Sequence, residues 1–223
     1  MGVTSATKPK QKKIKTRQKI VNQAVQLFNA NGVQNVTIRH IAAKMGIAHG
    51  NLTYHFKTKE DLLLAIYEQM RTQMSQSYLT DKGDISSFEH FHKLLLYLEY
   101  FHLKYSFFNV DVLEISRMYP KINKVLQKTL ELRQDQMVQL FNAFISDNLV
   151  VEEPTDRYLY LRHTVRIIIT FWQSQIEVLR GFSSNEGKMV ETIWHLVKPY
   201  MTNKGKQEYV RVTNLFLRYE DDI

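Results

Sequence analysis

The chain has 223 residues, a formal net charge of +8 and no cysteine. The lack of cysteine excludes disulfide frameworks, cysteine-ligated zinc sites and thiol catalysis. An apolar content of 44% is ordinary for a globular protein, and only 8 Gly and 4 Pro favour long helices over low-complexity chains. The positive charge indicates a polyanionic partner, although a membrane surface or simple solubility would explain the total equally well.

The positive charge is confined to the first quarter of the chain. Residues 1–60 contain eleven Lys and Arg and a single acid, Glu60, a balance of +10, whereas residues 61–223 contain nineteen bases and twenty-one acids, a balance of −2. A polyanion would therefore meet one part of the molecule only. The alternative is a solvated basic tail, because most of those bases lie between Lys8 and Lys19.

Apolar residues recur at helical spacing along the whole chain, and no stretch alternates as a strand would. Helices are predicted from about Thr16 to Asn31, Thr37 to Gly46, His49 to His55, Thr58 to Tyr78, Ser86 or Ser87 to Tyr105, Phe108 to Met118, Ile122 to Asn148, Thr155 to Arg180, Glu186 to Met201 and Lys206 to Arg218. Such helices must bury their apolar stripes against one another, so the predicted class is all-α.

Three regions follow from this pattern. Residues 1–13 lack apolar periodicity and are expected to form a mobile basic arm. Residues 14–61 are predicted to form a small helical domain, from which the helix beginning at Thr58 leads into a larger helical domain over residues 62–223. Breaks are predicted at 81–84 and 181–187. No targeting peptide or membrane-spanning run is recognised, so a cytoplasmic protein is expected.

The segment from Thr37 to Lys59 is typical of a helix-turn-helix. Gly46 suits a tight turn between two short helices, and the small side chain of Ala42 lets them cross closely. The second helix of such a pair can enter the DNA major groove, which is about 12 Å wide. The spacing alone would fit many helical hairpins. Here it lies in the basic segment and is rich in groups that can contact phosphates or base edges: Thr37, Arg39, His49, Asn51, Tyr54, His55 and Lys59.

At these residues the sequence resembles the TetR (tetracycline-repressor) family of bacterial transcription regulators. The resemblance spans about Thr16 to Leu64 and rests on Leu27-Phe28, Gly32, Val36-Thr37, Ile41-Ala42, Gly46-Ile47, Gly50, Leu52, Tyr54-His55-Phe56 and Lys59-Glu60. Two residues depart from the family pattern. Ala48 stands where a capping Ser is common, and Thr53 replaces the first of two usual aromatic residues, which weakens one expected phosphate contact.

The resemblance implies a role for each candidate DNA-binding residue. Thr37 would cap the second helix and contact a phosphate, Arg39 would reach a base or a phosphate, and His49, Gly50 and Asn51 would face base edges. Tyr54 and His55 would contact phosphates or sugars, and Lys59 would bind the DNA backbone. Tyr54 could equally serve in packing, and His55 could instead be only a structural hydrogen-bonder. The basic arm could contact the minor groove or only raise non-specific affinity.

The second domain is expected to dimerise and to bind an effector. The helix over residues 155–180 is apolar on two faces and so needs two partners. The resemblance implies a homodimer in which this helix and the one over 186–201 pack against their symmetry mates; the alternative is a monomer with a deeply buried helix. A two-fold dimer would read a palindromic operator.

The resemblance also implies a ligand cavity in this domain. Its candidate lining is Tyr97, Phe101, His102, Tyr105, Met118, Phe141 and Trp172, each of which could instead be core. An aromatic lining favours an apolar or aromatic small molecule, which would shift the dimer towards a state unable to bind DNA.

No catalytic, phosphate-loop or metal-ligand motif is found, and His90 and His92, two residues apart on a helix, cannot form a paired metal site. The sequence therefore predicts no enzyme activity, cofactor or metal. The favoured function is a dimeric, ligand-responsive, sequence-specific DNA-binding regulator, most simply a repressor. An architectural DNA binder without an effector and a helical lipid-binding protein with a basic membrane-facing end stay open.

Overall fold

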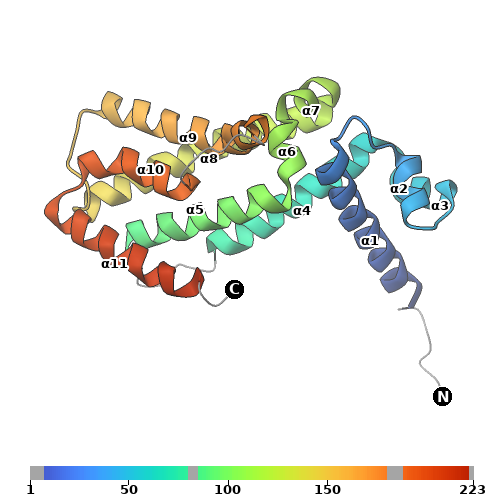
Figure 1. The fold of residues 1–223 in the computed structure, drawn as a ribbon, viewed down its shortest axis with the longest axis horizontal. Helices are drawn as coiled ribbons and strands as arrows, with labels where there is room; N and C mark the ends of the chain where they lie inside the picture. Colours follow the sequence, from blue (N-terminus) through green and yellow to red (C-terminus); the bar gives the residue numbers. More distant parts are fainter. Residues whose placement is uncertain (1–7, 80–84, 180–187, 221–223) are drawn as a thin grey trace, which may run out of the picture. The chain divides into compact units, whose positions relative to one another are not determined.

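The computed structural model describes residues 8–79, 85–179 and 188–220, and within them the fold is all-α, as predicted (Figure 1). The breaks predicted at 81–84 and 181–187 lie outside the described residues. The helices are α1 (Lys8–Asn31), α2 (Ile38–Lys44), α3 (His49–His55), α4 (Lys59–Leu79), α5 (Ser87–Lys104), α6 (Ser106–Val110), α7 (Val112–Met118), α8 (Pro120–Ser146), α9 (Thr155–Val178), α10 (Met189–Val197), the short 3₁₀ helix η1 (Lys198–Tyr200) and α11 (Asn203–Glu220).

The chain divides into two compact units. The first consists of residues 1–72 and 105–125, and the second of residues 73–104 and 126–223. The predicted boundary at residue 61 therefore differs from the observed one: α4 belongs to the first unit as far as Thr72, and α6 and α7 join that unit although they follow α5 in the sequence.

The first unit is built around the apolar stripe of α1. Ile20 and Phe28 of α1, Ile41 of α2, Leu52 of α3 and Leu62 of α4 are all completely buried in its core. The helix α1 begins at Lys8 rather than near Thr16, so residues 8–13 of the expected arm are helical and only residues 1–7 lie outside the described part of the chain.

The helix predicted from Phe108 to Met118 is in fact two helices, α6 and α7, separated at Asp111. The backbone N–H of Phe107 donates to Asn29 Oδ1 at 3.1 Å, and the rings of Phe28 and Phe107 lie 5.3 Å apart. Asp111 Oδ2 accepts the backbone N–H of Val33 at 2.9 Å. The break therefore places the Asp111 carboxylate against the loop between α1 and α2.

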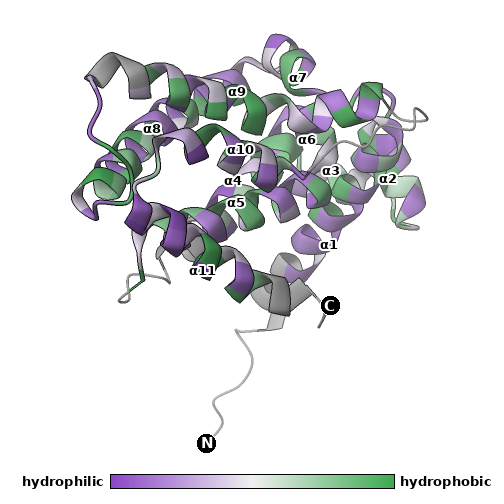
Figure 2. Cartoon of the chain, turned by 60° about the vertical axis from the view of Figure 1, so that its left-hand side comes forward, coloured by the Kyte–Doolittle hydropathy of each residue, from purple (hydrophilic) through white to green (hydrophobic). Residues whose placement is uncertain are grey.

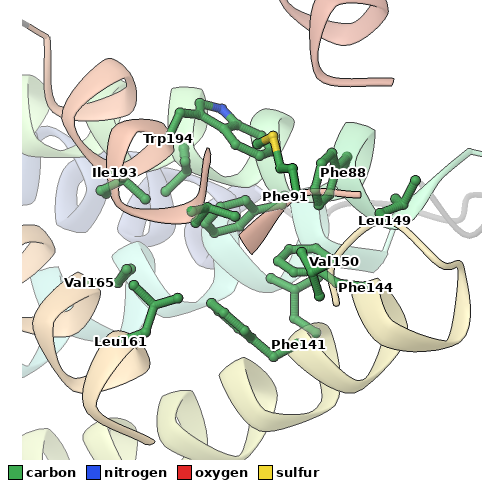
Figure 3. Close-up of a cluster of buried hydrophobic side chains, with 14 of the residues drawn as sticks. Phe88, Phe91, Phe141, Phe144, Leu149, Val150, Leu161, Val165, Ile193 and Trp194 are labelled. Carbon is green, nitrogen blue, oxygen red and sulfur yellow. The ribbon is translucent and has the colours of Figure 1, made fainter. Parts of the chain in front are cut away.

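An aromatic cluster forms the core of the second unit (Figure 3). Trp194 of α10 makes edge contacts with Phe88 and Phe91 of α5, with ring centroids 4.9 and 5.2 Å apart, and Phe88 contacts Phe144 of α8 at 4.9 Å. The indole N–H of Trp194 donates to His92 Nδ1 at 2.9 Å, so the only polar atom of this side chain is satisfied inside the core. Leu161 and Val165 bring α9 to the same cluster.

The elements α10, η1 and α11 at the end of the chain complete the second unit. The helix predicted over residues 186–201 is shorter, because α10 ends at Val197 and η1 follows through Pro199. Thr202 and the N-terminus of α11 lie against the end of α8, where Thr202 N–H donates to the carbonyl of Leu149 at 3.1 Å. Figure 2 shows hydrophilic and hydrophobic residues on different sides of most helices, as expected for helices with one buried and one exposed face.

None of the helices in the described residues is long and apolar enough to cross a membrane. The same residues contain no cluster of three or more His, Asp or Glu side chains that could hold a metal ion.

Candidate functional site

The start of α2 is fixed by a reciprocal cap. The hydroxyl of Thr37 accepts the backbone N–H of His40 at 3.2 Å, and His40 Nδ1 accepts the backbone N–H of Thr37 at 3.4 Å. The predicted capping role of Thr37 is therefore confirmed, and its partner is a histidine where Glu or Gln is usual. His40 was missed because the sequence pattern for this cap is defined by those longer side chains.

The turn between α2 and α3 depends on Gly46. Its φ of +63° lies in the left-handed region, and the N–H of the next residue, Ile47, donates to the carbonyl of Ala42 at 3.1 Å. No atom lies within 4 Å of where a Cβ would stand on Gly46, so the turn needs glycine for its backbone conformation and not for space.

The helix α3 exposes a polar face and buries an apolar one. His49, Gly50 and Asn51 are exposed, and Tyr54 is 68% exposed, whereas Leu52 and Phe56 are buried. Ala48, which stands where the family commonly has a capping Ser, makes no side-chain cap. The exposed residues His49, Gly50, Asn51 and Tyr54 therefore form a surface that could enter a DNA major groove.

Other predicted contacts lie beside this face. Arg39 and Thr37 are exposed at the start of α2. His55 is half-buried, with its ring edge-on to Tyr54 at 5.4 Å. The hydroxyl of Thr53 bonds to the carbonyls of His49 and Gly50 at 3.2 and 3.1 Å, so it is engaged within its own helix.

Lys59 lies in a different environment from the exposed candidates. Its ammonium donates to the carbonyl of Val33 and lies 5.7 Å from the centre of the Phe28 ring. Burial lowers the pKa of Lys59, and the carboxylates of Glu114 and Asp111 oppose this shift. The structure therefore places this predicted DNA contact against the loop before α2.

The start of α4 carries a reciprocal cap. Thr58 Oγ1 accepts the backbone N–H of Asp61 at 3.1 Å, and Asp61 Oδ2 accepts the N–H of Thr58 at 3.0 Å. Glu60 accepts the backbone N–H of Lys121 at 2.9 Å, so the first turn of α4 also holds the start of α8.

Arg17 is a candidate contact that sequence reasoning missed. It is exposed on α1, and its guanidinium lies 4.9 Å from the centre of the Phe56 ring, at the end of α3. An arginine stacked on an aromatic ring is held in place while its donors still face outwards. Its membership of the basic segment was the available signal, but the segment contains many other bases and Phe56 lies 39 residues away.

The predicted cavity residues are not brought together as one group. Tyr105 and Met118 belong to the first unit, where Met118 is exposed and the Tyr105 hydroxyl accepts from Gln69 at 3.0 Å. In the second unit Phe141 is core, Trp172 packs against the core cluster, and Tyr97, Phe101 and His102 follow one another on α5.

His102 is the polar member of the α5 group. Its side chain is buried, burial lowers its pKa from 6.5 to about 4, and its Nδ1 has no hydrogen-bond partner among the described residues.

The helix α9 has a second apolar face that is not covered by its own unit. Tyr158, Leu161 and Val165 are buried in the core. A stripe at intervals of seven, four and seven residues remains exposed and lies on one side of the helix: Tyr160, Ile167, Phe171 and Val178.

Comparison with known proteins gives consistent results for both halves of the chain. A sequence model described as "Bacterial regulatory proteins, tetR family" matches residues 20–66, and the TetR model "Bacterial transcriptional repressor" matches residues 69–209. Among curated relatives, the regulator AcrR of Shigella flexneri is 35% identical over 71 residues, which are 32% of this chain and 33% of AcrR. QacR of Staphylococcus aureus (strain Mu50) is 29% identical over 137 residues, 60% of this chain and 71% of QacR.

The matched region is short for the first curated relatives: it spans 33%, 35% and 55% of the lengths of AcrR, SrpR and TtgW. Solved structures match over more of the chain. A TetR-family regulator from Marinobacter aquaeolei has a TM-score of 0.78 at 23% identity, covering 92% of this chain and 98% of the other. A gamma-butyrolactone receptor has a TM-score of 0.67 at 18% identity, covering 95% and 100%. Since the repressor model alone matches more than half of its residues, the chain belongs to the TetR family of bacterial regulatory proteins.

Proposed function

We propose that this protein is a ligand-responsive transcriptional repressor that binds a palindromic operator as a homodimer. The main support is the exposed polar face of α3, made of His49, Gly50, Asn51 and Tyr54, on a helix whose position is fixed by buried Leu52. The segment that contains it has no acid before Glu60, so nothing in it repels phosphate.

The contacts divide into base readout and phosphate binding. His49 and Asn51 face base edges, and Gly50 lets the backbone approach the groove closely, because it has no side chain and a Cβ there would point into open space. Arg39, Tyr54 and His55 bind phosphates or sugars. The hydroxyl of Thr37 accepts the N–H of His40 and still has its own proton to donate to a phosphate. To these we add Arg17, stacked on Phe56.

The second copy covers the exposed stripe of α9. Tyr160, Ile167, Phe171 and Val178 form an apolar line that a monomer would leave in water, and the same line on a symmetry mate is self-complementary. The helix α10 contributes less than the sequence predicts, because its apolar residues are buried in the core of their own unit: Val190, Ile193, Trp194 and Val197.

The effector binds beside α5, next to Tyr97, Phe101 and His102. A neutral, buried imidazole with an unused Nδ1 suits an uncharged, largely apolar or aromatic molecule that has one hydrogen-bonding group. One structural neighbour is described as a gamma-butyrolactone receptor. Ligand favours one dimer state and operator the other, so binding of the two is reciprocal.

Selection of duplexes from a random pool with the full-length protein tests this function. We expect a palindrome whose half-sites are about 10 base pairs apart centre to centre, or a multiple of that spacing. Asn51→Ala should change the preferred base at defined positions, with a loss of ~1–3 kcal/mol in binding free energy for each lost base contact. Tyr54→Phe should lower the affinity for all duplexes by the same factor. Enrichment of no palindromic sequence would refute the proposal.

The effector is tested separately. A library of apolar and aromatic compounds is screened for a rise in the melting temperature of the protein, and each hit is tested for release of the selected duplex. His102→Leu should abolish the response to a genuine effector while leaving operator binding in its absence. Compounds that stabilise the protein without affecting operator binding would contradict a regulatory role.

A further inference from the structure

The loop between α1 and α2 is held at one residue, Val33, by two side chains that are distant in the sequence. Val33 is completely buried. Its N–H donates to Asp111 Oδ2 at 2.9 Å, and its carbonyl accepts from the ammonium of Lys59. The two partners come from the α6–α7 junction and from the start of α4. We name this arrangement, made of Lys59, Asp111 and the backbone N–H and C=O of Val33, the Val33 clamp.

Lys59 is built into this clamp and is not displayed on the surface. Its ammonium lies over the Phe28 ring at 5.7 Å and is attracted by the carboxylates of Asp111 and Glu114. By contrast, Lys57 is exposed two residues earlier. A lysine that bound only phosphate would need neither the buried carbonyl of Val33 nor carboxylates nearby, because both compete with phosphate for its charge.

The clamp lies directly before the DNA-reading helices. Gly32, with φ of +76°, ends α1, and the carbonyl of Val33 also accepts the N–H of Val36 at 3.4 Å, which forms a turn. The next residue, Thr37, begins the cap of α2. The place where α2 starts relative to α1 and α4 therefore follows from where Val33 is held.

We propose that Lys59 and Asp111 are positioning residues for DNA binding, which set the placement of α2 and α3 through Val33, and that Lys59 does not act as a phosphate contact. This rests on the DNA binding proposed above. It replaces the role that the family resemblance implies for Lys59, and it gives Asp111, an acid outside the helix-turn-helix, a part in operator affinity.

The test measures affinity for the selected duplex as a function of salt. We expect Lys59→Met and Asp111→Ala each to lower affinity about tenfold with no change in the slope of log affinity against log salt. The double variant should lose much less than the hundredfold expected of independent effects, because both side chains hold the same residue. Asp111→Asn keeps an oxygen that can accept the Val33 N–H and should recover most of the affinity.

Lys57→Met is the matched control, since it removes one exposed charge from the same segment. If Lys59→Met lowers the salt slope by about one while Asp111→Ala binds as the wild type does, Lys59 is a phosphate contact and the clamp is refuted. The clamp would also be refuted if Lys57→Met and Lys59→Met lowered the affinity and the salt slope by equal amounts. Failure of the wild type to bind any duplex would instead refute the proposed function.

Amide hydrogen exchange separates positioning from general loss of stability. In Asp111→Ala, exchange of the Val33 and Val36 amides should accelerate at least tenfold while that of Leu62 in the α4 core is unchanged. A uniform increase over the whole first unit would mean that the variant only destabilises the fold, and the positioning role would be refuted. If Asp111→Ala does not fold, Lys59→Met gives the same comparison, because it removes the other side chain that holds Val33.

Discussion

Burial determines the charge state of His102. Its pKa is lowered from 6.5 to about 4, so between these values the unfolded chain binds a proton that the folded protein does not. The free energy of unfolding should therefore fall as the pH is lowered through this window and level off below about pH 4. The contribution of His102 amounts to roughly 2 kcal/mol between pH 7 and pH 5.

Urea unfolding at both pH values measures this contribution. His102→Leu removes the titrating group, so the variant should lose roughly 2 kcal/mol less than the wild type on going from pH 7 to pH 5. An identical loss in the two proteins would show that His102 can take up a proton in the folded state.

Two glycines are required for different physical reasons. Gly46 has φ of +63° and open space around it, so Gly46→Ala should lower the free energy of unfolding by about 1 kcal/mol, and Gly46→Asn by less, because Asn tolerates this conformation. A Cβ on Gly205 would overlap the carbonyl oxygen of Leu149, so Gly205→Ala should cost about 3 kcal/mol and Asn should give no recovery. Urea unfolding of the four variants tests this; recovery by Gly205→Asn would contradict it.

Side-chain roles were predictable where they are local. The caps at Thr37 and Thr58 follow from the residue type at the start of an amphipathic segment, because a cap acts within three residues. The partner of Lys59 was not predictable, since Val33 lies 26 residues away and offers only its backbone. Asp111 was missed for the same reason, as Val33 lies 78 residues from it in the sequence.

At the scale of elements, periodicity predicted every long helix but not where α6 ends. Glycine and proline mark the ends of α1 and α10, whereas the break at Asp111 has neither. That break coincides with the hydrogen bond from Val33, a tertiary contact that local propensity does not encode. The shortened α10 is different, because Pro199 was visible in the sequence and a helix continuing through it would have lost a backbone hydrogen bond.

The exposed stripe of α9 gives a prediction at this scale. Phe171→Glu places a charge in the middle of the proposed dimer interface, where it would be buried without a partner, so the protein should sediment as a monomer at concentrations where the wild type is a dimer. Its operator affinity should fall as well, because a monomer would present only one α3 to the proposed palindrome.

Leu132→Glu on α8 is the matched control. Leu132, like Phe171, is an exposed apolar residue of the second unit, but it does not belong to the stripe on α9. Analytical ultracentrifugation of both variants shows whether α9 or α8 forms the dimer interface. Dissociation by Leu132→Glu with a dimeric Phe171→Glu would move the interface from α9 to α8.

At the scale of the whole molecule, the division of charge has a measurable consequence. The first quarter of the chain carries +10 and the remainder −2, so counterion release on binding DNA should come almost entirely from residues 1–60. Removal of residues 1–13 takes away four lysines of each protomer, of which Lys8 to Lys13 belong to the first turns of α1. Every lysine among them that contacts phosphate should lower the salt slope by about 0.9 for non-specific duplex.

The same truncation should leave the selected palindrome unchanged, because the proposed base contacts come from α3 and not from the basic turns of α1. The control is the removal of charge from the second unit, by Lys128→Gln and Lys206→Gln at exposed positions of α8 and α11, which should not alter the slope. Titrations at several salt concentrations decide between the two interpretations of the basic segment. An unaltered slope after truncation means a solvated tail, and a reduced slope means that α1 extends the DNA-binding surface beyond the helix-turn-helix.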